Sequence, residues 1–384
     1  IRLFAGIPHV FELRGTKRFK AGDPIIDFLT CMRAGRPFPG RVRVAFERTF
    51  ATDDRGSMDE RHRLPKFREG YGMVMYWDTL ARWISQRARR DARVLGVPLV
   101  FLQAADECNT IDKSAALRLL SVPNPHMTGH LHGVLPAHVG MRVRFTVKLN
   151  STHGLVQEQR ATIVSFLFHE EDNARYRACA AGEIFRPRFQ PAGVWLQVDD
   201  FVASPIAQEV AAWVADPLED TTDLSARPYF AHVVAWWRHK QEQRAAGLLL
   251  YDPVEAPFTW RSSETHTVKR TGFALTHERF LTSTASQGQT LRAGVTIDCA
   301  RIEPNESGKQ GANDDQWWLH LYVMLSRATC MEDMLLLRPP PPALLERGPP
   351  PHIQKALSAF EAKIADSVGA AAALAASLGI ALPE

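Results

Sequence analysis

The 384-residue chain lacks the patterns that mark several classes of protein. No apolar run is long enough to cross a bilayer as a helix, so the sequence supports no transmembrane segment. No basic and then apolar signal peptide opens the chain. The five cysteines are sparse, odd in number and without a C-x-x-C pair, which argues against a disulfide framework and against a zinc ribbon.

The composition that is present is typical of a globular protein. Hydrophobic residues make up 45% and charged residues 23%, and the length suits about two or three domains. The net charge of +4 is uneven, because residues 1–100 carry 20 Lys and Arg against 11 Asp and Glu. This basic segment suits contacts with a phosphate backbone. A solvated basic helix from Arg82 to Arg93 explains the same charge, and both interpretations stay open.

Local patterns predict helices and strands in the first part of the chain. Asp23 as N-cap and Pro24 at the first helical position predict a helix from residue 24. Apolar residues at i, i+3 and i+4 predict another over Tyr71–Arg93. A buried strand is expected over Pro98–Ala104, and a loop over 121–138, which is rich in Pro, Gly and His.

The middle of the chain is rich in strand patterns. Apolar and polar residues alternate over 141–149, and the strand signal recurs at 161–168 and 194–198. Three such strands suggest a small barrel or a sheet. Two helical segments that carry tryptophan, 206–214 and 231–244, form an apparent insertion after them.

The last third has the strand–helix–strand pattern of an α/β domain. Strands are expected over 258–261, 267–275, 294–300 and 333–337, and a helix over 316–327. Residues 339–351 hold seven prolines, which predicts a polyproline-type spacer rather than packed structure. Residues 352–381 are rich in alanine and predict a helix.

Two segments near the carboxyl end carry the clearest chemical signal. They are Thr282-Ser-Thr-Ala-Ser-Gln-Gly-Gln-Thr-Leu291 and Leu321-Tyr-Val-Met-Leu-Ser-Arg-Ala-Thr329. Hydroxyls and backbone N–H groups around a glycine can bind phosphate oxygens. An arginine at a helix end, such as Arg327, can present a planar fork of donors to a phosphoryl group. The alternatives are an ordinary turn and a cation that compensates the helix dipole.

Together the two segments resemble motifs V and VI of superfamily-one DNA helicases, in particular the RecD-like, PIF-type branch. The family's T-x-H-K-S-Q-G-x-T-L is matched by Ser286, Gln287, Gly288 and Thr290. The family's Y-V-A-L-S-R is matched in the second segment by Tyr322, Val323, Leu325, Ser326 and Arg327. A motif IV-like stretch from Phe11 to Arg18, and a stretch at 139–156 similar to the one that leads into the family's SH3-like insertion, extend the resemblance over most of the chain.

The resemblance implies an α/β fold with a RecA-like parallel sheet flanked by helices and interrupted by a β-rich, SH3-like insertion. Residues 1–138 and 255–338 would form the second RecA-like motor domain, and 139–254 the insertion with its extra helices. A proline-rich linker, 339–351, and a carboxyl-terminal helix, 352–384, would follow.

The resemblance also implies roles for single residues. Arg18 and Arg327 would be catalytic and reach the γ-phosphate of ATP. Gln287 and Gly288 would bind the nucleotide and link it to the strand-binding surface. The nucleic-acid contacts would come from Ser286, Thr290 and Thr284, of which Ser286 and Thr290 could instead hold the turn. The parent protein would use ATP and Mg²⁺, bind single-stranded or forked DNA, and be intracellular, in the nucleus or the mitochondrion.

Departures from the family pattern set the expected activity. Thr284 and Ala285 stand where the family has His-Lys, so a basic phosphate contact is absent. No G-x-x-x-x-G-K-[ST] loop occurs in the chain. We therefore expect the ATP and Mg²⁺ platform in an amino-terminal RecA-like domain that this sequence does not include, and an isolated chain that is inactive and without cofactor. The alternatives are a degenerate helicase-derived module that binds nucleic acid or acts as a scaffold, and a structural protein that acts through residues 339–351.

Two further groups of residues are open to a functional interpretation. His126, His130 and His132 could ligate zinc, but no cysteine or acidic ligand stands at metal-site spacing, which favours ordinary loop histidines. The pairs Trp236-Trp237 and Trp317-Trp318 could stack on bases of single-stranded DNA. Core packing is the usual role of tryptophan and is the interpretation preferred for both pairs.

Overall fold

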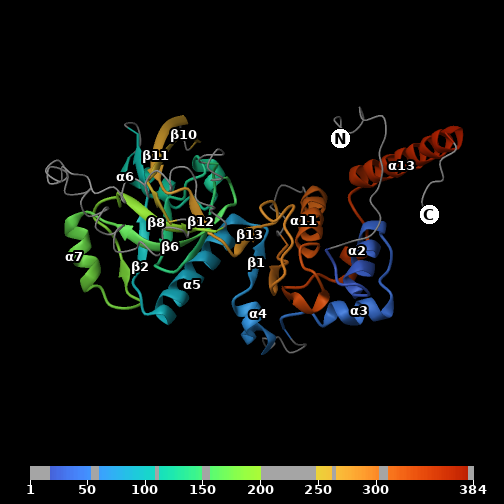
Figure 1. Cartoon of the computed structure of the whole chain (residues 1–384), viewed down its shortest axis with the longest axis horizontal. Coiled ribbons are helices and arrows are strands. Elements are labelled where there is room, and N and C mark those ends of the chain that lie inside the picture. Colours follow the sequence, from blue (N-terminus) through green and yellow to red (C-terminus); the bar gives the residue numbers. More distant parts are fainter. Residues whose placement is uncertain are drawn as a thin grey trace. The chain divides into compact units, whose positions relative to one another are not determined.

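The computed structural model describes residues 18–52, 60–108, 112–148, 156–199, 248–261, 265–301 and 310–378. Its contacts divide the chain into two compact units (Figure 1). Unit 1 combines Ile1–Tyr76 with Leu281–Glu384, and unit 2 is Trp77–Phe280. The predicted helices at 206–214 and 231–244 lie outside the described residues, as does all of the motif IV-like stretch except Arg18.

Unit 1 is built on a four-stranded sheet with parallel strands at its centre. The strand order is β13 (Phe280–Thr282), β1 (Tyr71–Val74), β14 (Val295–Asp298) and β15 (Met334–Leu337). Strand β14 runs parallel to both neighbours, and Val295 lies opposite Tyr71 on one side and Met334 on the other. The apolar runs that predicted strands at 294–300 and 333–337 are those of a sheet buried on both faces, and both predictions are confirmed.

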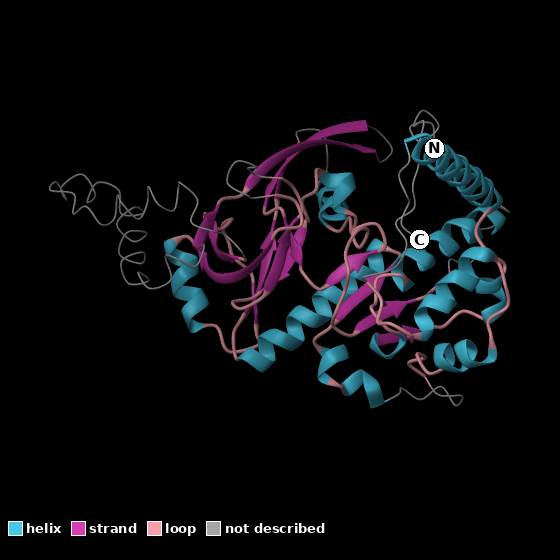
Figure 2. Cartoon of the chain, turned by 45° about the vertical axis from the view of Figure 1, so that its right-hand side comes forward, coloured by secondary structure: helices cyan, strands magenta, loops and turns pink. Residues whose placement is uncertain are grey.

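Helices flank this sheet (Figure 2). The helices of unit 1 that the structure describes are α2 (Pro24–Ala34), α3 (Gly40–Glu47), η1 (Glu60–Arg63), α4 (Pro65–Arg68), α11 (Gln310–Leu325), η4 (Met331–Asp333), α12 (Pro342–Glu346) and α13 (Pro351–Leu378). Helix α2 begins as predicted, because the Asp23 carboxylate accepts a hydrogen bond from the Ile25 N–H at 3.0 Å. Phe28 of α2, Ile297 of β14 and Trp318 of α11 are buried in one apolar cluster, which forms the core of unit 1.

The proline-rich segment is packed, so the prediction of an unpacked spacer is wrong. Its residues 342–346 form α12, and Leu345 is fully buried in the core of unit 1. The Glu346 carboxylate accepts the Phe38 N–H at 3.0 Å and pairs with Arg43 at 2.8 Å. The prolines restrict the backbone around α12. Between them, the apolar pair Leu344-Leu345 packs into the core of unit 1, which the number of prolines alone does not reveal.

Unit 2 contains mostly antiparallel sheets in the part of the chain that is described. The largest has the order β12 (Leu275–His277), β5 (Arg142–Phe145), β6 (Arg160–Leu167), β8 (Gly193–Val198) and β9 (Leu248–Tyr251). A second has the order β10 (Val254–Arg261), β11 (Thr265–Gly272) and β3 (Ala105–Glu107), and a third β4 (Val134–Ala137), β2 (Leu99–Gln103) and β7 (Ile184–Phe185). The helices of this unit are α5 (Trp77–Leu95), α6 (Lys113–Leu120), η2 (Pro125–Thr128) and α7 (Glu170–Ala178).

The sequence prediction is wrong at the start of the segment Tyr71–Arg93. Residues 71–74 form β1, and the helix α5 begins only at Trp77. The four residues are drawn into the sheet by parallel pairing with β14. The two backbones lie close together just before these strands begin, because a Cβ atom on Gly70 would lie 2.0 Å from the Gly294 carbonyl oxygen. Helical spacing of the apolar side chains cannot reveal a pairing partner more than two hundred residues away.

The contacts divide the chain at other positions than the predicted insertion boundaries. The division falls at 76/77 and 280/281, whereas the sequence placed the insertion at 139–254. Strand β12 pairs with β5 and β2 pairs with β7, so segments on either side of the predicted insertion belong to its sheets. No helix among the described residues is both long and apolar enough to cross a membrane.

Candidate functional site

The turn after β13 carries the first of the two motifs, and its hydroxyl groups stabilise the turn itself. The Ala285 N–H donates to Thr282 Oγ1 at 3.2 Å, and Ser286 Oγ donates to the Ser283 carbonyl at 2.8 Å. Gly288 follows with φ 79°, in the left-handed region. A side chain there costs about 1–2 kcal/mol, which accounts for glycine at this point of the turn.

The predicted nucleic-acid contacts in this turn differ in their exposure. Ser286 is fully buried, so its geometry supports the role of holding the turn rather than that of touching a phosphate. Thr284, Gln287 and Gly288 are exposed, and so is Thr290. The exposed residues are available to a ligand, whereas Ser286 is not.

Arg18 reaches both motifs. Its Nε donates to Thr290 Oγ1 at 3.2 Å, and its Nη1 donates to the Ser326 carbonyl oxygen at 3.2 Å. The residues joined in this way are 272 and 308 positions apart in the sequence. Arg18 therefore lies beside Arg327. The side chain of Gln287 is exposed on the same turn as Thr290.

Arg327 lies two residues beyond the end of α11, and its guanidinium donates to neutral oxygens. Nε donates to the Val323 carbonyl at 2.9 Å, Nη1 to the Gln289 carbonyl at 3.3 Å and Nη2 to Ser326 Oγ at 2.7 Å. The bond to Val323 is the helix-end contact that the sequence left as an alternative. The bonds to Gln289 and Ser326 go further, because they fix the guanidinium between the two motifs.

The electrostatics of the arginine pair favour an anion. Burial lowers the pKa of Arg327, and the neighbouring charge of Arg18 lowers it further, while Tyr322 acts in the opposite direction. Both causes disfavour the charged guanidinium, which nevertheless stays protonated at neutral pH because arginine is so basic. An anion with several oxygens near both guanidinium groups would offset the repulsion between their like charges.

One partner of the turn, His320, is marked by no sequence pattern. Ser283 Oγ lies 2.6 Å from Nδ1 of His320, which belongs to α11. Ser283 is buried, and burial also lowers the pKa of His320. This contact ties the turn to α11 at a second place besides Arg327. The two residues are 37 positions apart, and neither belongs to a pattern that marks the other.

The tryptophan pair at the end of the chain is part of the core. Trp317 and Trp318 are almost completely buried, and their ring N–H groups donate to the carbonyls of Cys299 and Leu345 at 3.2 and 3.5 Å. Trp318 stacks on Tyr322 with the ring centroids 5.4 Å apart. The preferred interpretation is thus confirmed for this pair, whereas Trp236-Trp237 lies outside the described residues.

The three histidines of unit 2 do not form a metal site. The rings of His126 and His130 are 4.6 Å apart, edge to face, and His126 also contacts Trp77. Burial lowers the pKa of His132 to about 4, helped by the charges of Arg144 and Arg270. No group of three potential metal ligands lies together among the described residues.

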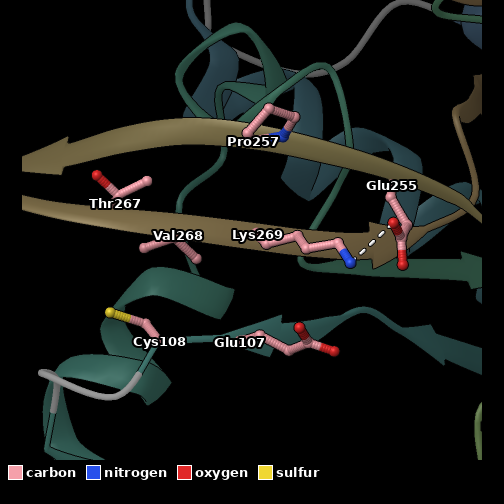
Figure 3. Close-up of a pocket in the computed structure, with 7 residues that line it drawn as sticks. All are labelled: Glu107, Cys108, Glu255, Pro257, Thr267, Val268 and Lys269. Carbon is pink, nitrogen blue, oxygen red and sulfur yellow. Dashed lines mark ion pairs between the residues drawn. The ribbon is translucent and has the colours of Figure 1, made fainter.

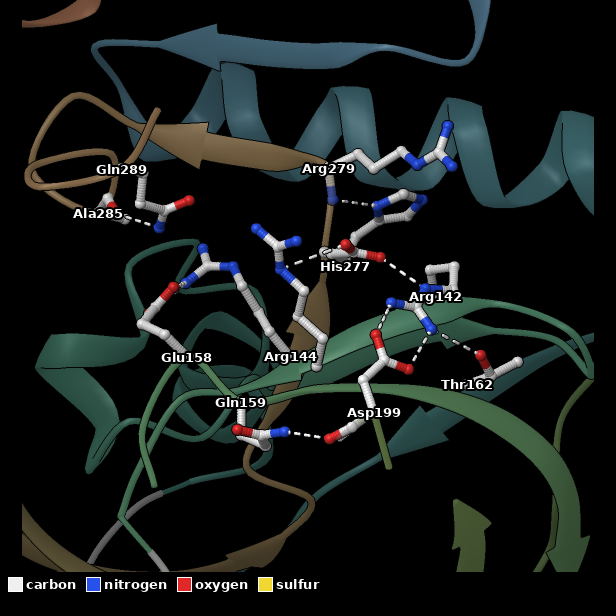
Figure 4. Close-up of polar contacts among 12 residues, drawn as sticks. Arg142, Arg144, Glu158, Gln159, Thr162, Asp199, His277, Arg279, Ala285 and Gln289 are labelled. Atoms are coloured by element: carbon white, nitrogen blue, oxygen red, sulfur yellow. Dashed lines mark hydrogen bonds and ion pairs between the residues drawn. The ribbon is translucent and has the colours of Figure 1, made fainter. Parts of the chain in front are cut away.

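A network of charged side chains holds the five-stranded sheet of unit 2 (Figure 4). Arg142 on β5 donates to Asp199 at 2.7 Å and to Glu278 at 2.7 Å. The hydrogen bond to Asp199 is the main cause that raises the pKa of Arg142. Arg144, two residues along, pairs with Glu158. Each arginine has its own carboxylate, so this network is internally balanced.

Unit 2 also has a shallow pocket of about 490 Å³ over β3, β10 and β11 (Figure 3). Its charged lining consists of Glu107, Glu255 and Lys269, and Lys269 pairs with Glu255 at 2.8 Å. That hydrogen bond is the main cause that raises the pKa of Lys269. Pocket residues that neutralise one another leave little charge for a ligand.

Comparisons with known proteins place the fold. No family model matches the chain, and no curated protein matches it. Among solved structures, the Pif1 helicase from Bacteroides in complex with ADP-AlF3 and single-stranded DNA is similar, with a TM-score of 0.50 and 12% identity over 92% of this chain and 57% of that one. The Pif1 helicase from Candida albicans has a TM-score of 0.45 and 15% identity over 91% of this chain and 60% of that one.

The first of these likenesses shows a shared fold, in which helices flank a RecA-like parallel sheet. The predicted α/β fold class is thereby confirmed. The chain spans less than two thirds of the length of either structure.

Proposed function

We propose that this chain is the carboxyl-terminal motor half of an ATP-dependent DNA helicase of the PIF type. The observation that carries the proposal is the meeting of Arg18 with Thr290 and Ser326, beside Arg327. The residues that resemble the motif IV neighbourhood, motif V and motif VI thus converge, although each motif by itself is weak. The parent protein would couple ATP hydrolysis to movement along single-stranded DNA and to separation of the duplex.

The donors present fit the phosphates of a nucleotide. Two guanidinium groups with fixed hydrogen bonds can bind the oxygens of a terminal phosphate, and stabilisation of charge in phosphoryl transfer by such an arginine is worth about 10³–10⁵ in rate. Arg327 is held at three points, so little reorganisation is needed when charge develops. Gln287 and Gly288, which are exposed, would bind the nucleotide and link it to the surface that binds DNA.

The residues present do not fit Mg²⁺. The described residues hold no cluster of carboxylates that could bind a cation, and the chain has no G-x-x-x-x-G-K-[ST] loop. Mg²⁺ and most of the nucleotide would be held by the other motor half. The isolated chain would bind phosphate oxygens without hydrolysing ATP.

A second candidate function is a nucleic-acid-binding or scaffold module without catalysis, derived from a helicase. The motif V turn favours it, because Thr284 and Ala285 lack the basic side chain that the family places there. Both candidates predict binding of single-stranded or forked DNA. They differ in the phosphate site, which only the motor half would need.

The test is a calorimetric titration of the 384-residue chain with tripolyphosphate, which presents the oxygens of a nucleotide tail. Charge-assisted hydrogen bonds contribute about 1.5–3 kcal/mol each. We therefore expect Arg18→Gln and Arg327→Gln each to weaken binding at least about tenfold. Arg338→Gln is the matched control, since this exposed arginine of unit 1 is paired with Asp298.

An equal loss of affinity in the control variant would show that tripolyphosphate binding depends only on net charge. That result would contradict the proposed phosphate site. An ATPase assay with single-stranded DNA completes the test. Hydrolysis stimulated by DNA in the purified chain would contradict the assignment to one half of a motor.

A further inference from the structure

The outward face of α5 in unit 2 carries a row of arginines. Arg82, Gln86, Arg89 and Arg93 are exposed and follow one another at spacings of four, three and four residues. At 100° per residue these four positions fall within an arc of about 60° on the helix. The opposite face is the one that packs on unit 2, with Leu80, Ile84, Ala88 and Ala92 buried. The row therefore runs along the solvent side of the helix, which is labelled in Figure 1.

The arginines of this row differ from the other arginines of the same helix. Arg87 and Arg90 are paired with Asp91, at 3.3 Å in the case of Arg90. Arg82 donates to the carbonyl oxygen of Asp78 at 3.3 Å, which is a backbone contact. Arg89 and Arg93 form no ion pair among the described residues. Their charges are thus open to an anionic ligand on the part of unit 2 that the structure describes.

The side chain of Arg93 is fixed at its base. A Cβ atom on Gly182 would lie 2.7 Å from Arg93 Cγ, so the aliphatic stem of Arg93 packs against the backbone there. Long basic side chains commonly bury the stem in this way and keep the charged head in water. This packing lowers the entropy that Arg93 would lose when its guanidinium binds a ligand.

The spacing and composition of the row suit a polyanion. Arg82 and Arg93 are about 16 Å apart along the helix axis, with Arg89 between them. Phosphates on one strand of a duplex repeat about every 3.4 Å, so three guanidinium groups over this distance can each meet a phosphate. Within the arc the side chains are polar, whereas a protein interface usually has an apolar centre. The carboxylate nearest to the arc belongs to Asp78, about 20° outside it at the amino-terminal end of the helix.

We propose that the row Arg82, Gln86, Arg89 and Arg93 binds the sugar–phosphate backbone of nucleic acid. The inference rests on the proposed function in one respect, namely that nucleic acid is the partner. It concerns another surface than the motif V turn and needs no nucleotide. Contacts of this kind position a protein on the strand without reading bases. The row would hold unit 2 on DNA whether or not the chain takes part in hydrolysis.

The experiment measures the salt dependence of binding by the full chain. Fluorescence anisotropy with a labelled oligo-dT strand is recorded at several KCl concentrations, with a labelled duplex as a second probe. Each phosphate contact contributes a slope of about −0.7 in log K against log salt for a single strand, and about −0.9 for a duplex. The triple variant R82Q/R89Q/R93Q should therefore make the slope about 2 less negative on oligo-dT. The same slopes predict about 10²-fold weaker binding near 0.1 M salt.

The matched control is R41Q/R68Q/R188Q, which removes the same charge. These three exposed arginines are paired with Asp27, Glu69 and Glu171, and they lie outside α5 and outside the Arg18 and Arg327 pair. The control should keep the slope of the wild type. Circular dichroism melts confirm that both triple variants are folded.

The outcomes separate the inference from the proposed function. If the wild type binds DNA and the R82Q/R89Q/R93Q slope is unchanged, the inference fails and the proposed function stands. If the wild type binds neither probe, the proposed function fails and the inference with it. Equal losses in both triple variants would show an effect of net charge alone. Competition by poly-glutamate as strong as that by an oligonucleotide of equal charge would identify an acidic protein as the partner and overturn the inference.

Discussion

The deepest ion pair of unit 2 offers a quantitative test of its architecture. Arg270 on β11 is fully buried, and Asp106 on β3 is 6% exposed. Nε and Nη2 of Arg270 donate to the two carboxylate oxygens of Asp106 at 2.6 and 2.7 Å. The remaining donors reach the carbonyls of Leu131 and Leu119, both at 3.2 Å. One guanidinium thus joins two strands, helix α6 and the loop that holds Leu131.

Asp106→Ala would leave this guanidinium buried with carbonyl partners only. Removal of one partner of a buried ion pair costs about 3–5 kcal/mol, because the other charge remains desolvated. For a unit of about 200 residues, 1 kcal/mol lowers the melting temperature by about 2–4 °C. We therefore expect the transition of unit 2 to fall by roughly 10 °C. The paired replacement R270M/D106L, which removes both charges, should cost much less and could stabilise the unit.

Differential scanning calorimetry measures the change, and hydrogen exchange in peptides that cover β11 assigns it to unit 2. Asp27→Ala is the control, since Asp27 and its partner Arg41 are 43% and 77% exposed. Exposed pairs of this kind contribute about 0–1 kcal/mol. A cost for Asp106→Ala as small as that of the control would refute the reasoning, because it would mean that Arg270 finds water or another acceptor.

Two further predictions concern pH and packing. His277 is buried, its Nδ1 accepts the Arg279 N–H at 3.1 Å, and burial lowers its pKa well below 6.5. Below pH 6.5 the unfolded chain therefore binds more protons than the folded one, and the melting temperature should fall as the pH drops. The fall should be smaller in His277→Gln, while the control His352→Gln, at an exposed site, should behave as the wild type. Gly348→Ala should destabilise unit 1 by more than about 1 kcal/mol in urea unfolding. The reason is that Gly348 has φ 80° and that the new Cβ would lie 2.8 Å from Gly35 Cα. A neutral effect would contradict the close packing of these two backbones.

Elements with a local signal could be predicted from the sequence. The cap at Asp23 and the apolar runs of β14 and β15 are encoded in a few neighbouring residues, and the structure confirms each. Segment Tyr71–Arg93 shows the limit, because its first residues become a strand only when β14 is present to pair with them. The proline-rich segment shows the same limit, since its count of prolines does not reveal that Leu345 has a place in the core.

The candidate site divides in the same way. The two motifs could be recognised from sequence, because their spacing is local and the glycine and hydroxyl groups of a turn occupy consecutive positions. Three other features became visible only in the folded chain. Arg18 meets Thr290 and Ser326, Ser286 is buried, and Arg82, Arg89 and Arg93 face solvent. Contacts between residues hundreds of positions apart, and the side of a helix that is left uncovered, depend on how the sheets and helices pack, and no local pattern records that.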